Sequence, residues 1–126
     1  MKTLTVIVHG AGLGDRLRLI ENLAADLPAG DALAVMLTSP RLTAAFPGLR
    51  LPPGAIVHAV SGGCPCCIGR VTLQVTLVRL LRESRPRRLF VELAGTDHLR
   101  RTVVALTADR LASALCVAGA LQAHPS

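Results

Sequence analysis

The densest group of reactive side chains in the sequence is a cysteine motif near the middle of the chain, Cys64-Pro65-Cys66-Cys67. Three thiols within four residues can present several sulfur ligands to one cation, and thiolates favour zinc or Cu(I) over hard ions such as magnesium. Closed structural zinc sites usually take paired cysteines from two separated segments, and the sequence holds no second pair of this kind. The motif therefore predicts an incomplete coordination shell, typical of a protein that passes its metal on.

The sequence leaves the fourth ligand open among His9, His58, Cys116, a carboxylate and water. Cys116 lies inside an apolar run, so we expect it to be a core residue. A second interpretation of the motif is a redox or nucleophilic centre, because a helix beginning near Gly69, together with Arg70, would favour a reactive thiolate. A third is a structural role. A disulfide staple is not expected, since adjacent cysteines cannot pair without strain and cytosolic proteins rarely keep disulfides.

A glycine-rich turn follows the first apolar run of the chain, with glycines at Gly10, Gly12 and Gly14. A phosphate-binding loop reads G-x-x-x-x-G-K-[ST], where the lysine reaches the phosphates and the hydroxyl binds magnesium. Here Asp15 takes the lysine position and Arg16 the hydroxyl position. Asp15 would repel a triphosphate, whereas Arg16 could retain some affinity for phosphate. We interpret the segment as a tight turn that needs positive φ, with Asp15 as the N-cap of the next helix; a degenerate nucleotide site is the alternative.

The hydrophobic pattern predicts the elements that position these residues. Residues 71–82 fit both a half-buried strand and a helical stripe, and we predict a helix because parallel strands need a crossover connection. Strands and helices in alternation predict an α/β fold, a three-layer, mostly parallel sheet of about five strands with flanking helices. We expect strands at residues 3–8, 32–37, 55–60, 88–93 and 114–118, helices at 16–27, 71–82 and 98–108, and a short helical turn at 41–46.

Length and composition exclude several classes of protein. The chain has 126 residues, 51% hydrophobic and 17% charged, which predicts one domain over residues 1–126 and excludes disorder. The longest apolar stretch spans residues 111–121, whereas a membrane helix needs about 20 residues, so we expect a cytoplasmic protein. The net charge is +6, yet only Phe46 and Phe90 are aromatic, and nucleic acid is therefore not an expected partner. We interpret the arginines between residues 79 and 88 as a solvated helix end and turn.

Two motifs carry a resemblance to a known family. Gly63 and the cysteine motif read G-C-P-C-C after a predicted strand, and Glu92-Leu93-Ala94-Gly95 ends a later one. In this order they resemble the CobW-like branch of the CobW/HypB/UreG family of P-loop GTPases and metallochaperones. The resemblance implies a P-loop NTPase-like fold and GTP binding and hydrolysis coupled to delivery of zinc, cobalt or nickel.

The family pattern also implies roles for individual residues. It assigns Glu92 and Gly95 a place near magnesium and the γ-phosphate, and it matches Gly12 and Gly14 to the second and third glycines of the loop. The metal ligands that it implies are Cys64, Cys66 and Cys67.

The sequence departs from the family pattern at the nucleotide site. His9 stands where the first glycine belongs, Asp15 where the lysine belongs, Arg16 and Leu17 where two threonines belong, and Ala118 where a strand ends in aspartate. The guanine-recognising N-K-x-D segment and the C-terminal domain have no counterpart in the sequence. We therefore expect a truncated relative with a degenerate P-loop, in which GTP and magnesium are doubtful cofactors and GTP hydrolysis is lost.

These observations lead to one functional hypothesis and two alternatives. The leading hypothesis is a metallochaperone or metal-dependent regulator that binds zinc or a similar thiophilic metal and serves a client metalloprotein. The alternatives are a GTP-binding protein or GTPase with residual nucleotide binding at Gly12, Gly14, Arg16 and Glu92, and a thiol redox or interaction module. A sheet shortened after the fifth strand leaves an apolar edge, so we expect a homodimer or a partner subunit.

Overall fold

The computed structural model describes residues 2–28, 30–38, 49–59, 70–93, 96–108 and 111–125. They form a five-stranded sheet in the order β3-β2-β4-β1-β5, and all paired strands run parallel. The strands are β1 (Thr3–His9), β2 (Leu33–Leu37), β3 (Ile56–Ala59), β4 (Arg88–Leu93) and β5 (Leu115–Gln122). The helices are α1 (Leu13–Ala25), α3 (Arg70–Ser84), the 3-10 helix η2 (Thr96–His98), α4 (Leu99–Leu106) and α5 (Leu111–Ala114).

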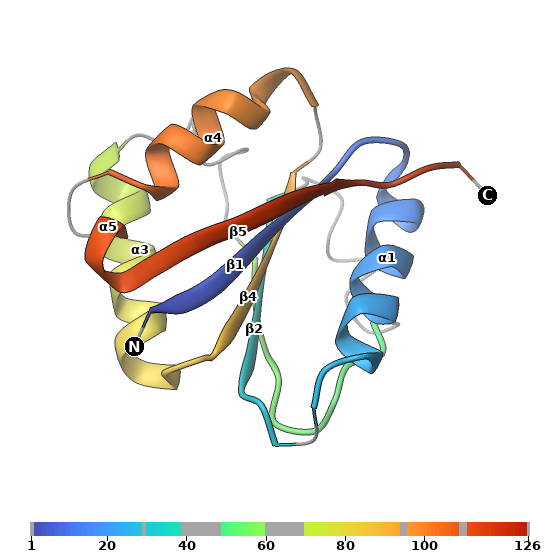
Figure 1. Cartoon of the computed structure of the whole chain (residues 1–126), viewed down its shortest axis with the longest axis horizontal. Coiled ribbons are helices and arrows are strands. Elements are labelled where there is room, and N and C mark those ends of the chain that lie inside the picture. The colour runs from blue at the N-terminus through green and yellow to red at the C-terminus, as the bar shows by residue number, and fades with distance from the viewer. Residues whose placement is uncertain are drawn as a thin grey trace.

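Helices cover both faces of the sheet and complete three layers. Figure 1 shows α1 on one side and α3, α4 and α5 on the other. Each side has its own hydrophobic cluster, and the neighbouring residues Ile7 and Val8 of β1 belong to opposite clusters. This follows from the pleat, because successive side chains of a strand point to opposite faces. The predicted α/β class and the three-layer, five-stranded architecture are confirmed.

The ambiguous segment between β3 and β4 is a helix, as predicted. Leu73 and Leu77 are fully buried on one side of α3, in the spacing of four that places two side chains on the same helical face. The helix ends at Ser84, and the chain then turns into β4. The turn expected at residues 41–46 lies outside the described residues. In the part of the chain that the structure describes, no helix is long and apolar enough to cross a membrane.

The prediction that Cys116 is a core residue is wrong. The cysteine is exposed, although Leu115 beside it is buried. β5 is an edge strand, and Leu115 faces the cluster formed with α3, α4 and α5. Cys116 points to the opposite face, where it pairs in register with Leu4, itself 37% exposed. The apolar run thus predicted the strand correctly. One face of β5 is uncovered because β5 lies at the edge of the sheet, and the run of apolar residues does not show this.

Candidate functional site at the carboxyl edge of the sheet

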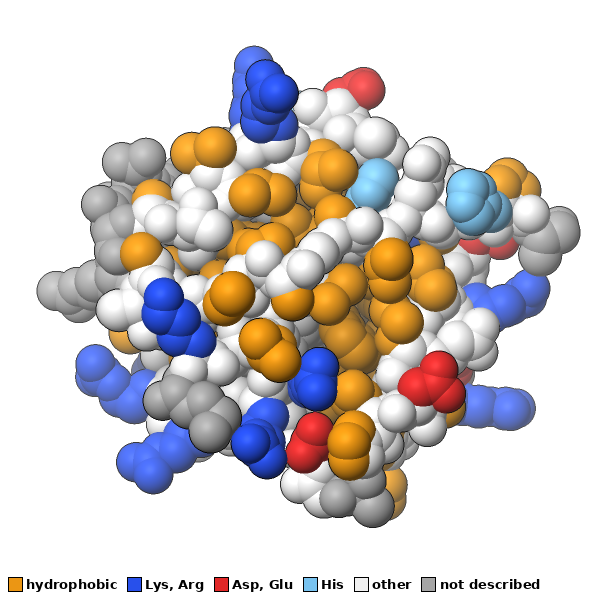
Figure 2. Space-filling model, viewed as in Figure 1, with side chains coloured by type: hydrophobic (Ala, Val, Ile, Leu, Met, Phe, Trp, Pro, Cys, Tyr) orange, Lys and Arg blue, Asp and Glu red, His pale blue; other side chains and the backbone are white. Residues whose placement is uncertain are grey.

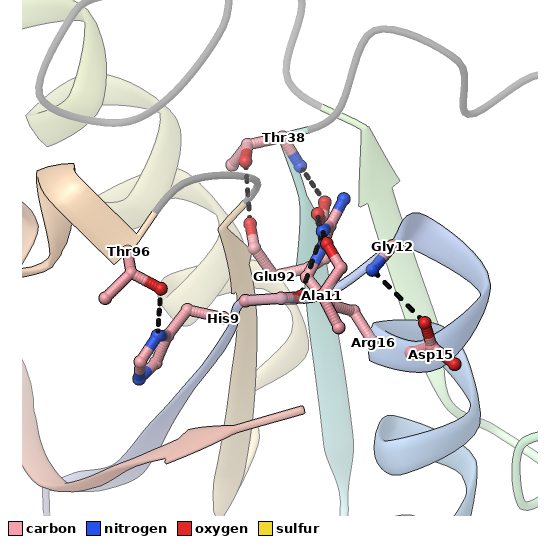
Figure 3. A network of polar contacts seen from close by, with 9 residues as sticks. His9, Ala11, Gly12, Asp15, Arg16, Thr38, Glu92 and Thr96 are labelled. Atoms are coloured by element: carbon pink, nitrogen blue, oxygen red, sulfur yellow. Dashed lines mark hydrogen bonds and ion pairs between the residues drawn. The ribbon is translucent and has the colours of Figure 1, made fainter. Parts of the chain in front are cut away.

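The carboxyl ends of β2, β4 and β1, which are neighbours in the sheet, bring several polar residues to one edge. Ligands of open α/β sheets bind at this edge, outside the carboxyl ends of the strands. The glycine turn follows β1, Thr38 follows β2, and Glu92 lies near the end of β4. Figure 3 shows these residues side by side, with Arg16 of α1 between them.

Arg16 and Glu92 form a buried ion pair at this edge (Figure 3). The two residues are 76 positions apart in the sequence. The Arg16 Nε donates to Glu92 Oε2 at 2.7 Å, and the exposed fractions of the two side chains are 5% and 0%. Both charges have therefore left water, and the loss of hydration is offset by their attraction and by hydrogen bonds.

The Arg16 guanidinium also holds the glycine turn. Its Nη1 donates hydrogen bonds to the carbonyl oxygens of Gly10 at 3.1 Å and Ala11 at 2.9 Å. Positive φ, predicted for this turn, is confirmed at Gly10 (φ 87°) and occurs also at Ala11 (φ 50°). Gly12 has a φ of −87° and Gly14 lies inside α1. A loop that binds phosphate points N–H groups at the anion, whereas here two carbonyl oxygens accept hydrogen bonds from a cation of the same chain.

The prediction that Asp15 is the N-cap of α1 is wrong. The helix begins at Leu13 with Gly12 as its N-cap, and Asp15 is the third residue of its first turn. From there its Oδ2 accepts a hydrogen bond from the Gly12 N–H at 3.2 Å, which is one half of a capping box. An acidic side chain thus occupies the positive end of the α1 dipole.

Thr38 holds the other side of the Glu92 carboxylate. Its backbone N–H donates to Glu92 Oε1 at 2.9 Å, and its hydroxyl donates to the Glu92 carbonyl oxygen at 2.7 Å. Both carboxylate oxygens of Glu92 therefore accept hydrogen bonds, one from Thr38 and one from Arg16. These contacts fix the orientation of the carboxylate and join the ends of β2 and β4.

His9 closes the site on the side of η2. It is the last residue of β1 and is 5% exposed, and burial lowers the pKa of His9 below its ordinary value of 6.5. Its Nδ1 lies 3.1 Å from the hydroxyl oxygen of Thr96. Sequence reasoning missed both Thr96 and Thr38. The signal that could have found them is their place just after predicted parallel strands, where the carboxyl edge must collect polar residues.

The structure brings together part of the site that the sequence predicts. Gly12, Gly14, Asp15, Arg16 and Glu92 lie at the carboxyl edge, as described above. Gly95 and the three cysteines of the motif, Cys64, Cys66 and Cys67, lie outside the described residues. Among the residues that are described, no group of three or more His, Cys, Asp and Glu side chains could hold a metal ion.

The candidates for a fourth metal ligand lie on different strands. His58 is on β3 at one edge of the sheet, Cys116 is on β5 at the other edge, and His9 is on β1. His58 and Cys116 are exposed, whereas His9 is buried against Thr96. The fold therefore places these three candidates on three different strands, two of them at opposite edges of the sheet.

Comparison with known sequences identifies the family. A sequence model of the CobW/HypB/UreG nucleotide-binding domain matches residues 19–122. The chain belongs to the CobW/HypB/UreG family. The match begins after Arg16, so the turn in which this chain departs from the family's loop precedes the matched residues.

One curated protein is similar to this CobW/HypB/UreG chain over part of its length. The zinc chaperone YeiR of Escherichia coli (strain K12) is 40% identical over 55 residues, which are 44% of this chain and 17% of that protein. The chain thus aligns with less than a fifth of that relative. No solved structure matches the chain.

Proposed function

We propose that this CobW-family chain binds zinc or another thiophilic cation through Cys64, Cys66 and Cys67 and acts as a metallochaperone or metal-dependent regulator. The observation that carries the proposal is the 40% identity to a zinc chaperone, in a sequence that has three thiols within four residues. Thiolates at this spacing suit zinc. The proposal places the protein in the cytoplasm, where thiols stay reduced and available to a metal.

We further propose that this chain does not hydrolyse GTP. Magnesium needs oxygen ligands in near-octahedral geometry, but the hydroxyl position of the loop is Arg16, whose guanidinium already pairs with Glu92. Phosphate binding needs N–H groups and a lysine at the start of α1, where Asp15 instead accepts a hydrogen bond from Gly12. The residues present therefore do not fit a magnesium-bound triphosphate. The positive charge beside Glu92 comes from the buried Arg16 guanidinium instead of a magnesium ion.

Metal analysis of the purified protein tests the first proposal. We expect stoichiometric zinc in the unaltered chain and none after replacement of all three motif cysteines by serine. The matched control is Cys116→Ser, which removes an exposed thiol outside the motif and should leave the zinc content unchanged. Zinc retained by the triple variant would contradict the proposal. Rapid alkylation of the motif cysteines in the presence of zinc would favour the redox alternative.

Titration with a fluorescent GTP analogue and magnesium tests the second proposal. We expect no saturable binding in the micromolar range, because Arg16 and Asp15 leave neither a cation site nor an anion site at the turn. Saturable micromolar binding would support the alternative, a nucleotide-binding protein that uses Gly12, Gly14, Arg16 and Glu92.

The sequence also predicts a homodimer or a partner subunit, and the exposed edge strand β5 makes this prediction testable. The edge strand β5 is exposed over most of its length, and such an edge can pair with a second strand. Light scattering of the purified chain should report a dimer, and a monomer would contradict this expectation.

A further inference from the structure

An open groove of about 890 Å³ lies at the amino ends of the strands, opposite the candidate site. Its lining comes from the start of β1, the second half of α3, the turn into β4, and α5. Figure 1 places the N-terminus beside the end of α3 and the start of β4. Lys and Arg side chains gather at this corner, the lower left of Figure 2. The groove thus joins three segments that are far apart in the sequence.

The rim of the groove is cationic. Lys2 precedes β1, Arg82 lies in the last turn of α3, and Arg85 follows that helix; all three residues are exposed. Arg87 also lines the groove, and its Nη1 lies 3.7 Å from Asp31 Oδ1, so part of its charge is neutralised. None of the described residues that line the groove is acidic. Clefts lined by charge of one sign concentrate ligands of the opposite sign.

Arg85 has a backbone conformation that favours glycine. Its φ is 44°, and its N–H donates to the Leu81 carbonyl oxygen at 3.0 Å, which is the left-handed cap at the end of α3. Glycine usually takes this position because it has no Cβ. The chain instead has an arginine there, which places a third cation at the rim at some cost in backbone stability.

The less exposed lining residues form the floor of the groove, which is mostly apolar: Val78 and Leu81 of α3, Pro86, and Ala114 of α5. The polar residue among them is Thr3, whose hydroxyl donates to the Pro86 carbonyl oxygen at 2.7 Å. The volume falls within the range of about 300–1,000 Å³ that ligand sites occupy. None of the described lining residues is aromatic, so the groove offers no surface on which nucleic-acid bases could stack. A ligand that matches both rim and floor carries carboxylates and apolar side chains together.

We propose that this groove is a docking site for an acidic segment of a partner protein, a segment that also carries apolar side chains. Its carboxylates pair with Lys2, Arg82 and Arg85, and its apolar side chains cover the floor. Because the groove and the carboxyl edge lie at opposite ends of the strands, a segment docked in the groove does not cover the carboxyl edge. The inference does not depend on zinc binding by the cysteine motif.

Fluorescence anisotropy with a labelled peptide of alternating glutamate and leucine tests this inference at low ionic strength. We expect saturable binding to the 126-residue chain, weakened about tenfold or more by Arg82→Glu with Arg85→Glu, because attraction becomes repulsion. The matched control is Arg100→Glu with Arg101→Glu, which reverses two exposed charges on α4, outside the groove. Arg85→Gly should also weaken binding, and it suits the backbone at this position, so unfolding would not explain the loss.

Four outcomes would overturn the inference. Two are the absence of saturable binding and an equal loss of affinity in the groove variant and the α4 control, which would reflect net charge alone. A third is unchanged affinity for a peptide with serine in place of leucine, since the apolar floor would then take no part. The fourth is tighter binding of inorganic triphosphate or a single-stranded oligonucleotide, lost in the groove variant, which would make this a phosphate site.

Discussion

Replacing Arg16 by methionine should be among the most destabilising single changes in this protein. The substitution keeps an unbranched apolar stem but removes the guanidinium that pairs with Glu92. The Glu92 carboxylate, 0% exposed, then loses the positive charge that Arg16 places 2.7 Å from its Oε2. The carbonyl oxygens of Gly10 and Ala11 lose the donor that Arg16 provides to each of them.

The size of the effect follows from the burial of the pair. Removing one partner of a buried ion pair costs about 3–5 kcal/mol, because an uncompensated charge stays inside. A domain of this size has an unfolding free energy of about 5–15 kcal/mol, so a large part of it would be lost. The matched control is Arg79→Met, which breaks the pair between Arg79 and Glu83, whose side chains are 77% and 70% exposed. Exposed pairs of this kind contribute about 0.5 kcal/mol or less.

Urea unfolding followed by far-ultraviolet circular dichroism measures the difference, because the chain has no Trp or Tyr for fluorescence. With urea slopes of about 1–3 kcal/mol per molar, a loss of about 3–5 kcal/mol in Arg16→Met should lower the midpoint by roughly 1–5 M. Adding Glu92→Gln removes the buried charge and keeps an acceptor for the Thr38 N–H. The double variant should therefore be about 1–3 kcal/mol more stable than the sum of the two single changes predicts.

Two results would refute this reasoning. One is a midpoint for Arg16→Met that falls no further than that of Arg79→Met. The other is strict additivity of Arg16→Met and Glu92→Gln. Either would mean that the 2.7 Å contact does not compensate a buried charge.

Three further predictions concern stability. Because burial lowers the pKa of His9 below 6.5, the unfolded chain binds more protons than the folded chain as pH falls below about 6.5. The urea midpoint of the unaltered chain should therefore drop in that pH range, and the midpoint of the His9→Gln variant should drop less. The control is His58→Gln, which replaces an exposed histidine and should behave like the unaltered chain. Arg85→Gly should raise the unfolding free energy by about 0.5–1 kcal/mol, since the φ of 44° at Arg85 favours glycine. A decrease in the unfolding free energy would contradict the idea that the Arg85 backbone is strained. Gly10→Ala should lower the unfolding free energy by about 1–2 kcal/mol, because φ is 87° and an added Cβ would meet the Gln122 side chain at 3.0 Å. The control Gly14→Ala should raise the melting temperature, because an added Cβ within α1 would meet no atom of the described residues within 4 Å.

Local pattern was enough to predict most of the architecture. The uncharged run of β1 and the helical stripe of α3 identified their elements because periodicity depends only on neighbouring residues. Cys116 was predicted wrongly for the same reason: an apolar run identifies a strand, but the number of faces that are covered depends on where the strand lies in the sheet. Asp15 was predicted to lie before α1, as its N-cap. An aspartate at the N-cap and an aspartate in the first turn that accepts a hydrogen bond from the N-cap N–H give similar sequence patterns.

The sequence by itself determined the α/β class, the family motifs, the cysteine motif as the candidate metal site and the absence of a loop lysine. Only the tertiary structure decided what replaces the missing nucleotide contacts, because Arg16 and Glu92 are 76 positions apart and meet only when β4 pairs with β1. The same holds for the groove, where Lys2 joins Arg82 and Arg85 through the packing of α3 beside the start of β1. Spacing along the chain sets which residues share an element, whereas strand order and helix packing set which distant charges meet.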